Sequence, residues 1–452
     1  MHDESYPSPL AAWSTLLILL LAAILSFVDR QILNLLVEPI RRDLQINDTQ
    51  MSLLMGLSFA LFYVVCGIPF GRLADSRSRR GVIALGVLLW SGATAACGLA
   101  VAYWQFLLGR ISVGVGEAAL TPAAYSLLAD SFPSERRATA FSIYAMGIYL
   151  GSGIAFLLGS LAVAFTAAQP SVELPLLGSI RSWQLVFILL GIVGLVFTLL
   201  LSAIREPLRQ GVGAGSVVPL AQVFDYLLAN RRTVLHHNLG FACLAVAGYG
   251  SSSWVPTFLM RTYGWSAQHA GGVYGGLVLV LGCLGILFGG RLSEHLARRG
   301  YRDANMRVGF LAALGALPWV VAFPLAQDGR LAALLLAPTV FCLSMPFGVA
   351  AAALQEIMPN PMRGQASSLY LLVITLIGLG AGPTLVALLT DYLFADDRAL
   401  RYSLLLVSSV AVALAALLLG GGLAPYRRSV EHLAAWVPST SAPAVVVTAL
   451  RG

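Results

Sequence analysis

The decapeptide "GRLADSRSRR" (Gly71–Arg80) recurs without a gap as "GRLSEHLARR" (Gly290–Arg299), far along the same chain. A second pair of similar segments is "DSFPSERRATA" (Asp130–Ala140) and "EIMPNPMRGQA" (Glu356–Ala366), in the same order and at nearly the same separation. Two copies of one pattern in one order predict a protein of two parallel repeats, with a binding site at their interface.

Long apolar runs surround both copies of the decapeptide. Of the 452 residues, 58% are hydrophobic and only 11% are charged, and the mean hydropathy is +0.81. Soluble domains carry about 25% charged residues, so the composition predicts an integral membrane protein with many spans. The five cysteines lie in apolar runs without a metal-ligand spacing. We therefore expect small buried thiols, no metal and no cofactor.

The basic charge comes from arginine alone, because the chain contains no lysine and has a formal net charge of +7. A basic chain often binds nucleic acid, but these arginines lie in short loops between apolar runs, where they orient a membrane protein. Most of them fall on the side that holds both termini and the central linker. We therefore expect a multi-pass protein of the cell (inner) membrane with both termini cytoplasmic, and no nucleic-acid partner. No basic residue precedes Arg30, so the first apolar segment is expected to be a retained helix rather than a secretory signal.

A helix needs about 20 mainly apolar residues to cross the hydrocarbon core. We predict an all-α integral membrane fold of twelve such helices in two pseudo-symmetric six-helix bundles. The expected helices are 12–37, 50–74, 80–101, 104–130, 137–166 and 182–204, then 232–260, 268–296, 306–326, 331–357, 365–392 and 401–424. The two bundles occupy residues 1–205 and 232–424, with a cytoplasmic linker at 206–231 and a cytoplasmic tail at 425–452.

Four ionisable residues lie well inside the predicted helices of the first bundle: Asp29, Arg30, Arg110 and Glu117. Each costs about 2.5–3.5 kcal/mol at a helix centre, so they should face one another or a water-filled cavity. Arg110 and Glu117 are seven residues apart and share one helix face. We expect Asp29, Glu117 and Arg110 to couple transport to protons and Arg30 to bind an anionic head group, for which its fork is suited. A purely structural ion pair is the alternative.

Weaker candidates for substrate contacts rest on depth in the membrane. They are Tyr63, Tyr149, Tyr370 and Trp254, the last within "GYGSSSW" (Gly248–Trp254). Helix packing through small residues is an equally good interpretation of that segment.

The first decapeptide resembles the G-x-L-a-D-r-x-G-R-R loop of the major facilitator superfamily, with Ser78 where glycine is usual. The segment that begins "VGVGEAALTP" at Val113, the Asp29–Arg30 pair and "WVPTFLMR" (Trp254–Arg261) are similar to Spinster-type transporters. This resemblance implies alternating access and a cytoplasmic gate that opens and closes during the cycle. Its expected residues are Gly71, Asp75, Arg79, Arg80, Arg137, Glu294, Glu356 and Arg363. The alternative is that these arginines only orient the chain.

The function expected from these features is transport of an amphipathic lipid-like anion, driven by protons through a rocker-type movement of the two bundles. Resemblance to Spinster-type transporters implies lysophospholipids or sphingosine phosphates as the cargo. The alternative is transport of drugs or small organic anions such as sugar acids, because such carriers share parts of the pattern. An embedded enzyme is not expected, since no catalytic constellation appears in the sequence. The expected partners are protons, the cargo and the bilayer, and the expected state is a monomer.

Overall fold

The structure, a computed structural model, describes residues 6–434 except 169–170, 175–177, 208, 210–219 and 360–361. Within the described residues, eleven helices are long and apolar enough to span a membrane. A further long helix, α11 (Arg231–Tyr263), is less apolar because it carries polar residues such as Asn238 and Ser251. The predicted all-α membrane fold with twelve spanning helices is confirmed by this arrangement.

The first half of the chain forms one bundle, and several of its spans are interrupted. The elements are α1 (Pro9–Gln31), η1 (Ile32–Leu35), α2 (Val37–Leu44), α3 (Asp48–Ser52), η2 (Leu53–Leu57), α4 (Ser58–Ser76), α5 (Arg79–Cys97), α6 (Tyr103–Glu117), α7 (Leu120–Ser131), α8 (Ser134–Ala168) and α9 (Ser182–Leu201). A hairpin of β1 (Ser171–Leu174) and β2 (Gly178–Arg181) joins α8 to α9. The sequence analysis did not predict this hairpin.

The second half repeats the pattern after a short linker helix, α10 (Leu220–Ala229). Its elements are α11, α12 (Ala267–Leu277), η3 (Val278–Gly282), α13 (Cys283–Arg298), α14 (Ala304–Leu325), α15 (Gly329–Ser344), α16 (Pro346–Glu356), α17 (Arg363–Val373), η5 (Ile374–Ala381), α18 (Gly382–Leu388), η6 (Leu389–Phe394), η7 (Asp397–Ala399) and α19 (Leu400–Ala434). The last helix continues beyond its expected end at residue 424 and reaches Ala434.

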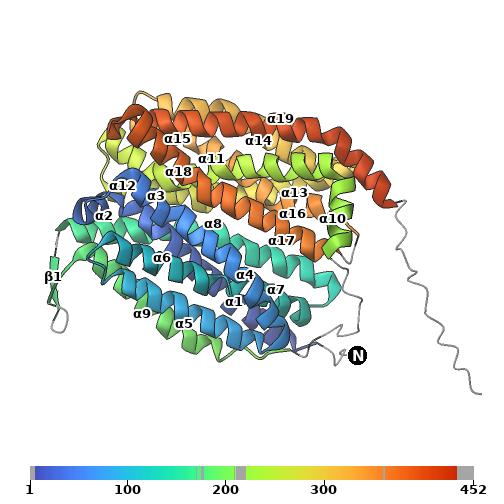
Figure 1. Ribbon diagram of the computed structural model, residues 1–452, viewed down its shortest axis with the longest axis horizontal. Helices are drawn as coiled ribbons and strands as arrows, with labels where there is room; N and C mark the ends of the chain where they lie inside the picture. The colour runs from blue at the N-terminus through green and yellow to red at the C-terminus, as the bar shows by residue number, and fades with distance from the viewer. Residues whose placement is uncertain are drawn as a thin grey trace, which may run out of the picture.

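Figure 1 shows the two bundles side by side, with α1–α9 in blue to green below and α11–α19 in yellow to red above. One end, which we call the arginine-rich end, carries the first described residues, α10 and the end of α19. The opposite end, which we call the far end, carries α2, α3 and the hairpin. The helix α10 lies across the bundle, whereas most helices run along its long axis.

The two halves share an apolar core toward the far end. Ile32, Leu36 and Ile40 of the first half are fully buried in the same cluster as Trp254 and Phe258 of the second. Close helix packing extends this contact, because a Cβ on Gly153 of α8 would lie 2.6 Å from the Leu279 side chain of η3. The far end is therefore closed in this structure.

The span that carries Glu117 is broken in the middle. The helix α6 ends at Glu117, and α7 begins at Leu120. Pro122 explains the break, since it has no N–H to donate to the carbonyl of Ala118 and its ring crowds that carbonyl. Glu117 therefore lies at a kink rather than inside a continuous helix.

Candidate functional site

The centre of the first bundle contains a buried ion pair between Arg30 of α1 and Glu117 of α6. Arg30 Nη2 lies 2.6 Å from Glu117 Oε2, and Arg30 Nε donates to the same oxygen at 2.6 Å. Ser26 lies four residues before Arg30 and so on the same helix face, and its hydroxyl also donates to Glu117 Oε2, at 2.5 Å. The Glu117 side chain is fully buried, whereas Arg30 keeps 16% exposure. Arg30 is therefore the member of the pair that a ligand can reach.

Asp29 does not pair with its neighbour Arg30, because successive residues on a helix point about 100° apart. Its Oδ2 accepts a hydrogen bond from Thr94 of α5 at 3.2 Å. Arg110 donates to the backbone carbonyls of Leu54, at 3.1 Å, and of Asp29, at 3.4 Å. The expected cluster of two acids and two cations thus exists. However, Arg110 donates to the backbone of η2 and α1 rather than to either carboxylate.

Three polar atoms of this cluster are buried without a hydrogen-bond partner among the described residues: Asp29 Oδ1, Glu117 Oε1 and Arg110 Nη2. An unpaired buried carboxylate oxygen is costly as an anion, but it becomes a donor once it binds a proton. The arrangement is thus chemically suited to taking up and releasing a proton on Asp29 or Glu117.

Aromatic rings surround the Arg30 guanidinium. Its carbon Cζ lies 4.4 Å from the ring centre of Phe59, 4.9 Å from that of Phe27 and 5.0 Å from that of Tyr63. Such contacts are favourable by about 0.5–2 kcal/mol each. The hydroxyl of Tyr63 also lies 3.1 Å from that of Thr121. Tyr63 is therefore beside Arg30, and the rings leave an apolar surface next to a cation.

The other predicted substrate residues lie elsewhere. Tyr149 of α8 packs edge-on against Phe347 of α16, with ring centres 5.6 Å apart, so it bridges the halves. Tyr370 is buried in the second half, 5.3 Å from the ring of His237. Trp254 was expected to line a cavity, but it is fully buried and its indole donates to the Pro383 carbonyl at 2.9 Å. In this state Trp254 packs α11 against α18.

A polar bridge between the halves lies beside Arg30 and was not predicted. Gln31 Oε1 accepts from Asn34 Nδ2 at 2.5 Å and from the hydroxyl of Ser252, across the interface, at 3.3 Å. Asn34 lies one helical turn beyond Arg30, and that spacing was a signal the sequence did offer. Ser252 belongs to the segment "GYGSSSW" (Gly248–Trp254) already noted in the sequence, whereas no comparable signal identifies Thr94.

At the arginine-rich end, the predicted gate residues of the first half are bound within that half. Arg79 is buried and forms ion pairs with Asp130 and, at 3.1 Å, with Glu206. Arg80 donates to the carbonyls of Ser202 and Ile204. Asp75 is exposed, its backbone carbonyl accepts from Arg209, and Arg137 donates to the Phe132 carbonyl at 3.4 Å. A Cβ added to Gly71 would meet no described atom within 4 Å.

Glu206 links the linker to the loop between α4 and α5. Its Oε2 accepts from Ser78 at 2.6 Å, and its Oε1 accepts from the backbone N–H of Arg79 at 2.9 Å. Partial burial opposes its charged form. The hydrogen bonds from Ser78 and Arg79 outweigh this effect, so the pKa of Glu206 lies below its usual range. Ser78, which stands where glycine is usual in this loop, thus has a specific hydrogen-bond partner, Glu206.

The gate residues of the second half also stay within their half. Glu356 accepts from Asn305 and from Tyr426, both at 2.7 Å. Arg363 donates to the carbonyls of Gln355 and Met358, and Glu294 forms only an exposed pair with Arg298 at 3.6 Å. Among the described residues, the predicted gate contacts across the halves are therefore not formed in this state.

Comparison with known proteins agrees with this geometry. The sequence profile of the Major Facilitator Superfamily matches residues 19–383. The chain belongs to this superfamily. An MFS-type efflux pump of Mycolicibacterium smegmatis is 31% identical to this transporter over 93% of its chain and 95% of the pump. Human protein spinster homolog 1 is 26% identical, with 91% and 81% of the two chains covered.

A solved structure strengthens the Spinster-like assignment. It is a bacterial homologue of the human lysosomal transporter Spinster in an inward-facing, unoccupied conformation, with a TM-score of 0.75 and 26% identity. It covers 96% of this chain and 100% of the other. The sphingosine-1-phosphate transporter SPNS2 of Danio rerio is 24% identical over 82% of this chain. The chain is therefore a Spinster-like membrane transporter and not an enzyme, as the sequence predicted.

Proposed function

We propose that this Spinster-like transporter couples protons to the movement of an amphipathic, lipid-like anion, by alternating access between its two halves. The proposal is carried by the buried Arg30–Glu117 pair and by the unpaired oxygens of Asp29 and Glu117 beside it. An anionic head group competes with Glu117 for Arg30, and a displaced Glu117 takes up a proton more readily because it has lost its cation.

The surroundings of Arg30 support an amphipathic cargo. The rings of Phe27, Phe59 and Tyr63 offer apolar contact to a chain attached to the head group. The name of one relative also points to a lipid cargo, because that protein is called a sphingosine-1-phosphate transporter. A lysophospholipid or a sphingosine phosphate fits this chemistry.

In this structure the far end is closed, and among the described residues the predicted gate residues of one half do not contact those of the other at the arginine-rich end. With the arginine-rich end in the cytoplasm, as the arginine distribution indicates, this is an inward-facing state. In the outward-facing state Asp75 would approach Arg363 across the interface and close the cytoplasmic end.

The direct test is transport of a labelled lysophospholipid into proteoliposomes under an imposed pH gradient. We expect Asp29→Asn and Glu117→Gln to abolish the dependence of flux on the gradient. The matched control is Asp225→Asn, which neutralises an exposed acid on α10 and should transport like the wild type. Proton-coupled flux that is unchanged in both buried variants would show that the coupling assignment is wrong.

A second candidate cargo is a drug or small organic anion. The relative that favours it is the mycobacterial efflux pump, which is 31% identical. The same liposomes separate the two candidates. Flux of a small organic anion such as galactonate, without flux of the lysophospholipid, would support the second candidate.

A further inference from the structure

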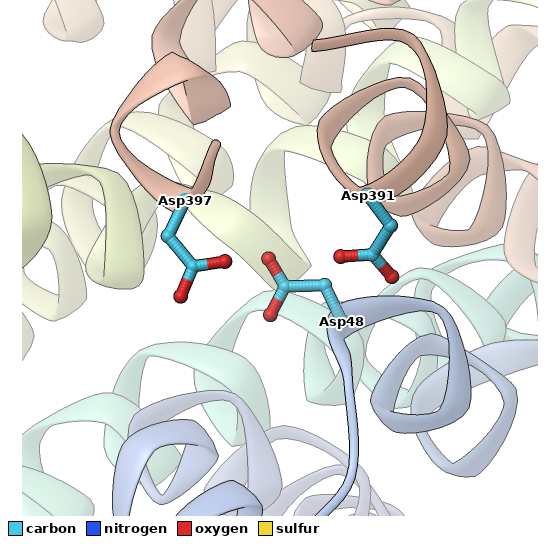
Figure 2. A group of neighbouring side chains, drawn as sticks. All are labelled: Asp48, Asp391 and Asp397. Atoms are coloured by element: carbon cyan, nitrogen blue, oxygen red, sulfur yellow. The ribbon is translucent and has the colours of Figure 1, made fainter. Parts of the chain in front are cut away.

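A group of charged residues joins the two halves at the far end, away from the central cluster. Figure 2 shows the carboxylates of Asp48 from the first half and of Asp391 and Asp397 from the second half turned toward one another. One oxygen from each of the three lies within 4.8 Å of the others. Three carboxylates at this distance repel one another unless cations or protons accompany them.

Two arginines supply the positive charge, and each reaches across the interface. Arg261 of α11 binds Asp48 through two nitrogens, at 2.6 and 2.9 Å, and Glu38 of α2 through Nε at 2.8 Å. Arg41 of α2 binds Asp397 at 2.9 and 3.4 Å, and its Nε lies 3.1 Å from Asp48.

Asp391 is held differently, by Thr49 at the start of α3. The backbone N–H and the hydroxyl of Thr49 both donate to Asp391 Oδ2 at 2.6 Å. Together with the arginine contacts, this makes four separate links between the halves: Arg261–Asp48, Arg261–Glu38, Arg41–Asp397 and Thr49–Asp391.

These partners make a metal ion a poor fit to the three carboxylates. Both oxygens of Asp48 and both of Asp397 already accept hydrogen bonds from guanidinium groups, and Asp391 Oδ2 accepts from Thr49. The geometry is that of ion pairs between two surfaces, with arginine as the cation.

Burial makes the inner part of this network strong. The Asp48 side chain is fully buried and that of Arg261 is 9% exposed, whereas Asp397 is about half exposed. Exposed ion pairs contribute little, but separating a desolvated pair leaves a charge without its partner, which is costly. The Arg261–Asp48 contact is therefore the main polar barrier to separating the halves here.

The network also contains more acid than base, since four carboxylates (Glu38, Asp48, Asp391 and Asp397) accompany two arginines. The other charged or titratable groups around it are Arg42 and Asp43 on α2, Arg181 on β2, Tyr103 on α6, Asp396 beside η7 and Arg398 on η7. Asp43 is already paired with Arg181 at 2.6 Å within the first half, so it does not add to the links between halves.

We propose that this network is a pH-sensitive lock between the halves, which keeps the far end closed while its carboxylates are ionised and releases it when they bind protons. Its members are Glu38, Arg41, Asp48, Thr49, Arg261, Asp391 and Asp397. Arginine stays charged at any relevant pH, so only the acids titrate. The closed state needs them as anions. Its advantage is therefore present above the ordinary carboxyl pKa of about 4 and is lost as the pH falls through and below that value. The lock is independent of the cargo and of Asp29.

The test measures the distance between spin labels placed on the two halves at the far end. Labels on Arg42→Cys of α2 and Gln268→Cys of α12, both exposed positions, are introduced after replacing the five native cysteines. Pulsed electron–electron double resonance in proteoliposomes then gives the populations of short and long distances between about pH 7 and about pH 3.5, a range that includes the ordinary carboxyl pKa.

We expect the long-distance population of the otherwise unchanged protein to grow as the pH falls. Asp48→Asn should raise the ratio of open to closed far ends by about thirtyfold or more at neutral pH, the effect of losing a buried charge pair, and should reduce the response to acid. Arg261→Lys keeps the charge but loses the two-nitrogen contact, so it should fall between the wild type and Asp48→Asn. The matched control Asp43→Asn, whose ion pair lies within one half, should behave like the wild type.

Two results would overturn the proposal. One is an identical distance distribution in the wild type and Asp48→Asn at every pH. The other is a response to acid that persists in Asp48→Asn but disappears in Asp29→Asn, because that would assign it to the central cluster. A response that persists in Asp29→Asn supports the lock even if proton-coupled transport is lost.

Discussion

At position 117, one carboxylate oxygen accepts two hydrogen bonds and makes a further ion-pair contact, while the other has no hydrogen-bond partner among the described residues. Ser26 and both Nε and Nη2 of Arg30 converge on Oε2, and Oε1 is buried and unpaired. Under the proposed coupling, the two oxygens of Glu117 have different roles: Oε2 binds the Arg30 guanidinium, and Oε1 accepts the proton.

Removing the charge of Glu117 should destabilise the protein. Glu117→Gln leaves the Arg30 guanidinium without its anion, at a cost of about 3 kcal/mol, at the low end for buried pairs because Arg30 keeps some exposure. The measurement is thermal unfolding in detergent. Adding Arg30→Gln to Glu117→Gln removes the unpaired charge, so the double variant should regain stability. A double variant less stable than either single variant would show that the pair does not act as a unit.

The identity of the central residues was predictable from the sequence, because a charge inside an apolar run is rare and costly. Their pairing was not. Asp29 and Arg30 are adjacent in sequence, and only the rotation of α1 against α5 and α6 decides that one meets Thr94 and the other meets Glu117. For Trp254 the predicted role was wrong for this state. The residue was expected to contact substrate in a cavity, but it is buried where α11 packs against α18.

At the scale of elements, the loop between α4 and α5 and the start of the linker form one unit. Arg79 and Ser78 bind Glu206, and Arg209 donates to the carbonyls of Ala74 and Arg77 at the end of α4. Arg209 thereby satisfies carbonyls that have no partner inside the helix. The linker is thus attached to the first half at its beginning, while α10 is attached to the second, where Tyr226 donates to the Ile357 carbonyl at 2.8 Å.

The contacts of Glu206 should depend on pH in a defined direction. Its pKa is lowered in the folded protein, so its hydrogen bonds are fully present above the ordinary carboxyl pKa and are lost as the pH falls through the lowered value. Glu206→Gln should therefore show at neutral pH the weakened loop that the wild type shows only in acid. Hydrogen exchange of the segment 76–81 measures this, because the Arg79 amide donates to Glu206.

The control for this experiment is Glu294→Gln, which removes an exposed acid in the corresponding loop of the second half. It should leave exchange in the segment 76–81 unchanged. Equal exchange in Glu206→Gln and the wild type at neutral pH would contradict the assigned role of Glu206.

Some elements could be predicted from the sequence pattern, and others could not. Twelve spans and the repeat could be predicted because hydropathy and the two decapeptides are local signals. The hairpin and α10 depend on short segments whose apolar content is too small or too mixed to stand out. The kink before α7 follows from Pro122, a local signal that the sequence did offer. The far-end residues Asp48, Arg261 and Asp397 looked like ordinary loop charges, because only the tertiary fold brings them together.

At the scale of the whole molecule, the two ends differ in whether charged contacts join the two halves. Charged contacts join the halves at the far end, whereas the charged clusters at the arginine-rich end each belong to one half. A rigid movement of one half against the other would break the first set and form the second. Asp75 and Arg363 are candidates for the new contact, since neither side chain is used across the interface here.

This movement predicts a state-dependent cross-link. Cysteines at Asp75 and Arg363, in a protein without native cysteines, should form a disulfide slowly in the state described here and faster when Asp48→Asn favours an open far end. The yield is measured by gel mobility after proteolysis within the linker. Cross-linking at equal rates with and without Asp48→Asn would contradict the movement.

The buried quartet of Asp29, Arg30, Arg110 and Glu117 holds two negative and two positive side chains when all are ionised. In that fully ionised state, the quartet adds no net charge to the empty carrier in the electric field across the membrane. In a cycle that carries one proton together with one monovalent anion, the loaded carrier is neutral as well. Such a cycle is electrically silent: the pH difference would drive it, and the membrane potential would neither speed nor slow it.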